Sequence, residues 1–436
     1  MDLQVLKSLE HFDNAIALDP SFAMAYLNRA ASSFTAKDFF ANLKQAVAHK
    51  DRVSEGEQLF ILAAEAGANG NARQQKEYLD KLVTLYPNDE RAHVAFGNFY
   101  FGQQDFLRAI EQYEKSISLS EGFAPAYNIL GYAYRQVEEY AKAEQVFRKY
   151  TRLIPNDPNP YDSYAELLLK MGRFDESIAN YRKALSIDAG FTASKVGLIM
   201  NVLYQGRKES ALEDAKKLYE TARNDGERRQ SLFIQAVVNA DAGHLPMSVR
   251  NFEDEYAIAE KNNDAGSMSA DLVAKGNVLL EMGEYEKALE AFLKAARTIS
   301  GSDLSAGVKQ NAALFVHYNA ARVAAARNDL AKANEEAESF RIGAEANKNP
   351  NQLRFAHELA GIIALTAKDG DKAVSELLQA NQQDPYNLYR LGLAYRIQGN
   401  ETKSREFFKK AAEFNSLPFL NYAFVRTKAK EMASPL

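Results

Sequence analysis

The sequence contains no cysteine and no tryptophan among its 436 residues. The absence of cysteine excludes disulfides, thiolate metal ligands and cysteine nucleophiles, although it does not reveal the compartment. Long apolar runs are missing too, since no stretch approaches the roughly 18 to 20 residues that a membrane-spanning helix needs. The first residues, MDLQVLKSLEHF, lack the basic-then-apolar order of a signal peptide.

No long block of charge of one sign is present either. The 53 basic and 58 acidic residues are interleaved and give a net charge of −5. A protein that binds nucleic acid or an anionic membrane through its charge carries a basic patch or stripe. We therefore expect neither as a partner, and both the cytoplasm and the periplasm stay open as locations.

Signatures of catalysis are also absent. The six histidines are scattered without the spacing of metal ligands, and His93 falls at an apolar position of its segment, which predicts a packed core residue. No glycine-rich phosphate loop, GxSxG or HExxH is found. We expect no enzyme, no cofactor and no metal.

What the sequence does contain is a period of 34 residues, visible in three independent columns. The first column holds small residues in helical context: Gly97, Gly131 and Ala165. The second holds Gln75, Ala109, Ala143, Ser177 and Ala211. The third holds Gly70, Gln104, Glu138, Gly172 and Gly206.

One unit of the period spans residues 123–157. Its first half places apolar residues at i, i+3, i+4 and i+7 from Tyr127 to Tyr134, which predicts a helix with one buried face. A turn follows near Glu138, and a second apolar stripe runs from Tyr140 to Tyr150 before Pro155 ends it. Each unit is thus predicted to be two helices that approach closely at the small residues.

This unit resembles the tetratricopeptide repeat, whose signature is aromatic–x2–L–G–x2–Y, then A–x3–F–x2–A, then P. Tyr26, Tyr127 and Tyr161 stand where the family often has tryptophan. The resemblance covers nearly the whole chain. It implies an all-α fold, a right-handed superhelical α-solenoid of about eleven helix–turn–helix repeats.

The spacing of the columns divides the chain into three parts. Residues 1–225 keep the 34-residue period, with an incomplete first repeat. Residues 226–416 keep the motif with a longer period, since the small-residue column continues at Ala236, Gly276 and Ala321. Residues 417–436 are predicted to form a capping helix and tail.

In this family the first helix of each repeat lines a concave groove that binds a peptide or protein segment. Carried over by position, the predicted groove residues are Arg91, Asn98, Asn128, Tyr132, Arg135, Asp162, Glu166, Tyr318, Arg322, Tyr389 and Arg396. Tyrosine, arginine and asparagine are a usual composition for interfaces. The family's clamp for a C-terminal carboxylate is not predicted, because Asn98 matches it but Val94 replaces its lysine.

The resemblance implies a non-enzymatic scaffold or adaptor whose partner is a protein or peptide. Two alternatives remain: a regulatory or sensory peptide receptor, and an accessory subunit in bacterial envelope assembly. Receptors of that kind usually carry a helix-turn-helix segment upstream, and residues 1–22 contain none. The stretch at residues 53–71, in which Ser54 is expected to cap a helix with Glu57, is similar to repeats of bacterial signalling proteins and lipoproteins. It favours a bacterial source.

Overall fold

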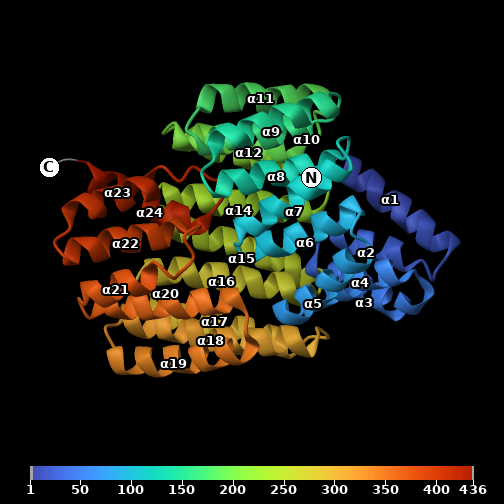
Figure 1. Ribbon diagram of the computed structural model, residues 1–436. Coiled ribbons are helices and arrows are strands. Elements are labelled where there is room, and N and C mark those ends of the chain that lie inside the picture. Colours follow the sequence, from blue (N-terminus) through green and yellow to red (C-terminus); the bar gives the residue numbers. More distant parts are fainter. Residues whose placement is uncertain (1–2, 435–436) are drawn as a thin grey trace. The chain divides into compact units, whose positions relative to one another are not determined.

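The computed structural model describes residues 3–434, which form α-helices and one 3-10 helix at Lys50–Arg52, without a strand in that range (Figure 1). In chain order the described helices α2 to α23 make eleven helix–turn–helix units, with α1 before them and α24 after them. The predicted all-α solenoid of helical repeats is therefore confirmed.

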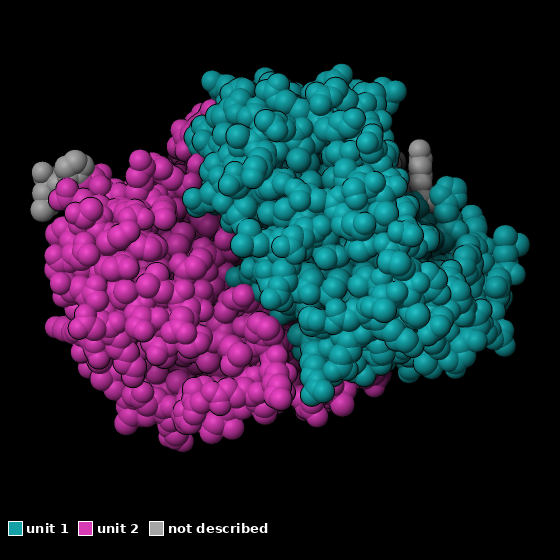
Figure 2. All heavy atoms as spheres, in the orientation of Figure 1, with its two compact units in different colours: residues 1–201 teal, residues 202–436 magenta. Residues whose placement is uncertain are grey.

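The chain forms two compact units, Met1–Asn201 and Val202–Leu436 (Figure 2). The helices of unit 1 are α1 (Leu3–Leu18), α2 (Ala23–Ala31), α3 (Ala36–Ala48), α4 (Glu55–Ala68), α5 (Ala72–Leu85), α6 (Glu90–Gly102), α7 (Phe106–Leu119), α8 (Ala124–Gln136), α9 (Tyr140–Leu153), α10 (Asn159–Lys170) and α11 (Phe174–Ile187). The boundary between the units falls within α12 (Thr192–Tyr204).

The helices of unit 2 are α13 (Lys208–Glu220), α14 (Asp225–Asp241), α15 (Leu245–Lys261), α16 (Ala265–Glu281), α17 (Tyr285–Ser300), α18 (Ala306–Ala326), α19 (Leu330–Asn347), α20 (Pro350–Thr366), α21 (Gly370–Leu377), α22 (Pro385–Ile397), α23 (Glu401–Ala412) and α24 (Leu420–Ala433). Of these, α14, α15 and α16 have 17 residues each, against 14 in α4 and α5. The boundary at residue 225, inferred from the change of period, remains a prediction.

The small-residue column marks where the two helices of a repeat touch. A Cβ atom on Gly131 of α8 would lie 2.6 Å from Cζ of Phe147 on α9. The same close approach joins Gly276 to Phe292 in unit 2. Glycine is therefore required because an aromatic ring of the second helix occupies the space of its side chain.

The third column marks the turn inside each repeat. Gly70, Gln104, Glu138, Gly172 and Gly206 all have a positive φ, between 60° and 86°. Each residue ends the first helix in the left-handed conformation, which reverses the chain direction. At Gln104 and Glu138 a side chain adopts a conformation that glycine adopts more readily.

The helix starts follow local chemistry. Ser54 and Glu57 form the predicted capping box at the start of α4, with the Ser54 amide donating to Glu57 Oε2 at 3.0 Å. His93 is buried, and its ring nitrogens lie 2.8 Å from Gln112 Oε1 and 3.0 Å from the Pro87 carbonyl. The predicted role of His93 as a packed core residue is thus confirmed.

First helices of successive repeats contact one another within each unit, and we call the layer that they form the inner layer. In unit 1, α8 contacts both α6 and α10. In unit 2, α20 contacts both α18 and α22. The last helix, α24, packs on α22 and α23 and also on α14, so that the two ends of unit 2 meet.

Candidate binding surface

On the inner layer of unit 1, three predicted groove residues come together from two repeats. The Tyr132 hydroxyl on α8 donates to Glu166 Oε2 on α10 at 2.9 Å, and Arg135 Nη1 donates to Glu166 Oε1 at 2.5 Å. The Arg135 guanidinium also lies 4.7 Å from the centroid of the Tyr132 ring. Arg135 and Glu166 are 15% and 14% exposed, so part of the pair reaches the surface.

Two other predicted residues of this layer hold neighbouring repeats together. Asp162 is buried and accepts a hydrogen bond from Ser194 Oγ at 2.7 Å. Asn128 Nδ2 donates to Asn159 Oδ1 at 3.3 Å, one repeat further on. These contacts rigidify the inner layer beside the Arg135–Glu166 pair.

Lys170, at the end of α10, has a strongly lowered pKa. Burial lowers the pKa of its ammonium to about 7, and the nearby Arg135 charge lowers it further, while Glu138 opposes the shift. A lysine with a pKa near 7 gains or loses its proton according to the charge of a ligand that binds beside it.

Nearer the start of unit 1, Arg91 and Asn98 are exposed. Arg91 forms a fork with Asp89, with Nε 3.1 Å from Oδ1 and Nη2 2.8 Å from Oδ2, and this lowers the pKa of Asp89. The Asn98 side chain accepts a hydrogen bond from the Tyr113 hydroxyl at 2.9 Å. Both residues are therefore fixed in place at an accessible surface.

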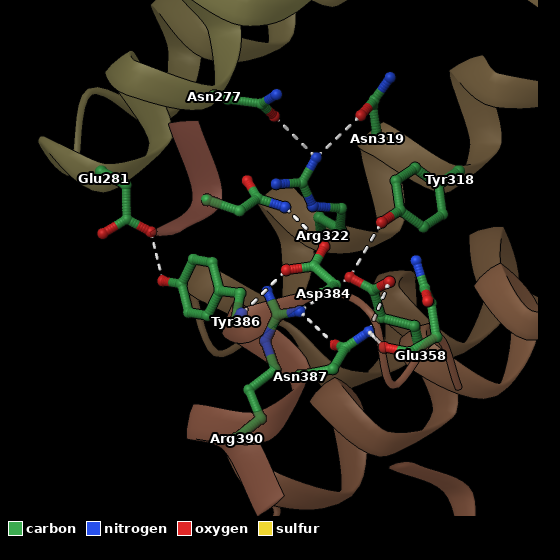
Figure 3. Close-up of polar contacts among 12 residues, drawn as sticks. Asn277, Glu281, Tyr318, Asn319, Arg322, Glu358, Asp384, Tyr386, Asn387 and Arg390 are labelled. Carbon is green, nitrogen blue, oxygen red and sulfur yellow. Dashed lines mark hydrogen bonds and ion pairs between the residues drawn. The ribbon is translucent and has the colours of Figure 1, made fainter. Parts of the chain in front are cut away.

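In unit 2 the predicted residues Tyr318 and Arg322 lie in a dense polar cluster (Figure 3). Tyr318 is buried, and its hydroxyl donates to Glu358 Oε1 at 3.0 Å, which Arg390 Nη1 also contacts at 2.7 Å. Arg322 Nη1 donates to Asn277 Oδ1 at 2.9 Å and to Asn319 Oδ1 at 3.2 Å.

The same cluster joins helices that are distant in sequence. The Tyr386 hydroxyl on α22 donates to Glu281 at the end of α16 (Figure 3). Asn421 Nδ2 on α24 donates to Asp384 Oδ2 at 2.7 Å. Burial and the nearby Glu358 charge raise the pKa of Asp384 to about 6. The polar side chains of this cluster therefore link α16, α18, α20, α22 and α24 within unit 2.

Tyr389 and Arg396 on α22 contact α23 and α24. The Tyr389 ring lies 5.4 Å from the Phe408 ring, and the Arg396 guanidinium lies 5.0 Å from it. Arg396 Nη1 also donates to Met432 Sδ on α24 at 3.3 Å. Both residues are half-buried and packed within unit 2.

The groove positions carried over from the family did not include the acidic partners Glu281, Glu358 and Asp384. One signal existed, because Glu358 and Arg390 are 32 residues apart and Arg135 and Glu166 are 31 apart, close to one repeat. Two opposite charges one repeat apart on first helices become neighbours on the inner layer. Within residues 3–434, no cluster of three or more His, Asp or Glu side chains is placed to hold a metal ion.

Family models described as tetratricopeptide repeat match residues 94–158, 159–191, 272–298 and 385–416. The matches fall on helix pairs with the packing described above. The chain is a tetratricopeptide repeat protein.

The relatives of this repeat protein are distant. Tetratricopeptide repeat-containing protein trd-1 of Caenorhabditis elegans is 23% identical over 69% of this chain and 36% of its own length. Anaphase-promoting complex subunit 6 of Arabidopsis thaliana is 22% identical over 34% of this chain and 28% of its own. The chain thus spans about a third of these curated relatives.

A solved tetratricopeptide repeat protein from Parabacteroides merdae is 14% identical, with a TM-score of 0.41, over 59% of this chain and 99% of its own. No helix in the described part of this chain is long and apolar enough to cross a membrane.

Proposed function

We propose that this repeat protein is a non-enzymatic scaffold that binds a segment of another protein along the inner layer of unit 1. The observation that carries the proposal is the Arg135–Glu166 pair, which lies against the Tyr132 ring and reaches the surface. Fixed arginine and tyrosine side chains lose little conformational freedom when they bind, and they are common hot spots of interfaces.

Unit 1 is favoured over unit 2 as the binding surface because its inner layer exposes predicted residues. Arg91 and Asn98 are exposed, whereas Tyr318 is buried and bonded to Glu358. In unit 2, Arg322, Arg390 and Arg396 already have partners within that unit.

Membership in an assembly is consistent with one relative, which is named as a subunit of the anaphase-promoting complex. A peptide receptor and an envelope assembly subunit would use the same surface and differ in the ligand.

The test is capture of partners from an extract of the source organism, with the full chain as bait and mass spectrometry as the readout. The variants are Arg135→Glu, Glu166→Arg and the double variant with the charges exchanged. If the pair contacts the partner, each single variant loses capture and the exchanged pair does not restore it, because the polarity offered to the ligand is reversed.

A matched control comes from the second-helix layer of the same unit. Arg173 Nη1 and Glu144 Oε2 lie 3.0 Å apart and are 30% and 20% exposed. Arg173→Glu breaks this similar pair, which lies outside the inner layer, and capture should stay at the wild-type level. Capture that survives Arg135→Glu, or that the exchanged pair restores in full, would contradict the proposed surface.

A further inference from the structure

Unit 1 contains a cavity of about 490 Å³ among α2, α4, α5 and α6. Its apolar lining comes from Met24, Leu27, Phe60, Leu82 and Tyr86. The volume falls in the range of sites that hold a small ligand or a few side chains. Of the predicted groove residues, Arg91 is in the lining, outside this apolar part.

Gly56 lets the ring of Tyr86 lie close to α4 at the wall of the cavity. A Cβ atom on Gly56 of α4 would lie 2.9 Å from Cε2 of Tyr86, so the ring rests directly on the α4 backbone. Tyr86 nevertheless stays 37% exposed, with its other surface toward solvent. An aromatic ring that is buttressed on one side and open on the other is a ready contact for a partner.

The charges at the cavity are unequal. Glu57 and Asp89 contribute carboxylates, and Arg91 contributes the only guanidinium among the described lining residues. Arg91 is committed to Asp89, and Glu57 and Glu90 also lie close enough to stabilise its charge. The lining residues therefore carry a net negative charge.

We propose that this cavity is the anchor site for the partner: it takes a leucine-, methionine- or phenylalanine-sized side chain from a segment in which lysine or arginine flanks that side chain. The inference rests on the proposed function of unit 1 and adds the chemistry of the ligand. The apolar lining supplies affinity through burial, and the carboxylates select basic flanks over acidic ones.

The test uses three fluorescein-labelled dodecapeptides with a common Gly-Ser host, and fluorescence anisotropy with the full chain. Their cores are Lys-Leu-Phe-Lys, Glu-Leu-Phe-Glu and Lys-Ser-Ser-Lys. We expect the first to bind at least tenfold more tightly than either of the others at moderate ionic strength. Equal affinities, or tighter binding of the acidic core, would overturn the inference.

A variant and its control locate the site. Met24→Trp fills the cavity and should weaken the binding of the first peptide at least tenfold. Leu107→Trp is the control, since Leu107 is a 68% exposed leucine on α7, outside the cavity lining. Unchanged affinity in Met24→Trp, or equal losses in both variants, would overturn the assignment.

A second measurement needs no variant. The first peptide with benzoylphenylalanine in place of phenylalanine should crosslink under ultraviolet light to α2 or α4, as mapped by mass spectrometry. Crosslinks confined to other helices would count against the cavity.

Partner capture separates the two proposals. Loss with Arg135→Glu but not with Met24→Trp would leave the scaffold standing and refute the anchor site. Peptide binding that Met24→Trp abolishes, with capture unaffected by Arg135→Glu, would refute the proposed surface and keep the cavity.

Discussion

Arg426 on α24 forms a two-point ion pair with Asp241 at the end of α14, although 185 residues separate them. The distances are 2.6 Å from Nε to Oδ2 and 2.5 Å from Nη2 to Oδ1, and the side chains are 5% and 1% exposed. This pair is where the two ends of unit 2 meet.

Removal of one partner should therefore open unit 2. Arg426→Met leaves the Asp241 carboxylate buried without its guanidinium, and we expect a loss of about 3 to 5 kcal/mol in the free energy of unfolding. In the double variant Arg426→Met/Asp241→Leu, much of the lost stability should be recovered. Urea unfolding gives the energies, and hydrogen exchange should show the loss of protection in α14 and α24.

Lys428→Met is the matched control on the same helix. Lys428 Nζ lies 3.1 Å from Glu281 Oε2 and is 52% exposed, so its removal should cost no more than about 1 kcal/mol. If Arg426→Met costs no more than this control, the pair does not close unit 2.

Glu255 should make unit 2 less stable as the pH rises. Arg229 bonds both oxygens of Asp271, at 2.6 Å and 2.8 Å, and also lies 3.3 Å from Glu255 Oε1, so one cation serves two buried acids. Glu255 Oε2 is buried and has no hydrogen-bond partner among the described residues. Burial, together with the Asp271 charge, raises the pKa of Glu255 from 4.5 to about 8.

The sign follows from linkage. Because the folded pKa lies above the unfolded one, the stability from protonated Glu255 is full below pH 4.5 and is lost as the pH rises to about 8. Glu255→Gln should flatten this slope and raise the unfolding free energy at pH 9, by roughly 1 to 3 kcal/mol. Glu253→Gln, at a half-exposed acid of the same helix, should leave the slope intact. Parallel pH profiles for wild type and Glu255→Gln would refute the shared-cation account.

Gly131→Ala should destabilise unit 1 despite the better helix propensity of alanine. The new Cβ atom would lie 2.6 Å from Phe147 Cζ, and we expect a net loss of about 1 to 3 kcal/mol. Phe147→Leu in the same chain should relieve part of it. Gly102→Ala is the control, since no atom beyond its chain neighbours and its own helix backbone lies within 4 Å of the Cβ position, and it should be neutral or stabilising. The energies come from urea unfolding, and similar losses at both glycines would contradict the packing account.

Lys170 should titrate near neutral pH. Reductive methylation with ¹³C-formaldehyde and NMR would follow each lysine, and one resonance should have a midpoint near pH 7. Arg135→Gln should raise that midpoint because it removes a nearby positive charge, and Glu138→Gln should lower it. Lys170→Arg assigns the resonance. A midpoint near 10 for every lysine would contradict the burial of Lys170.

Much of the repeat architecture was readable because its contacts are local. The Gly131–Phe147 contact lies within one repeat, and the residue that turns the chain, such as Gly172, recurs at a fixed offset. Helix–turn–helix geometry follows from such short-range rules, so three columns of residues predicted it. The candidate surface was predicted less completely, since Glu358 and Tyr86 follow no family position.

The sequence by itself determined the fold class, the repeat unit and the lack of catalytic motifs, because each depends on residues within about one period. Only the tertiary structure decided that Arg426 meets Asp241, that Tyr386 meets Glu281, and that Gly56 and Tyr86 shape a cavity. The physical reason is that small rotations from repeat to repeat add up along a solenoid. Their sum, which no single column encodes, decides which distant helices come into contact.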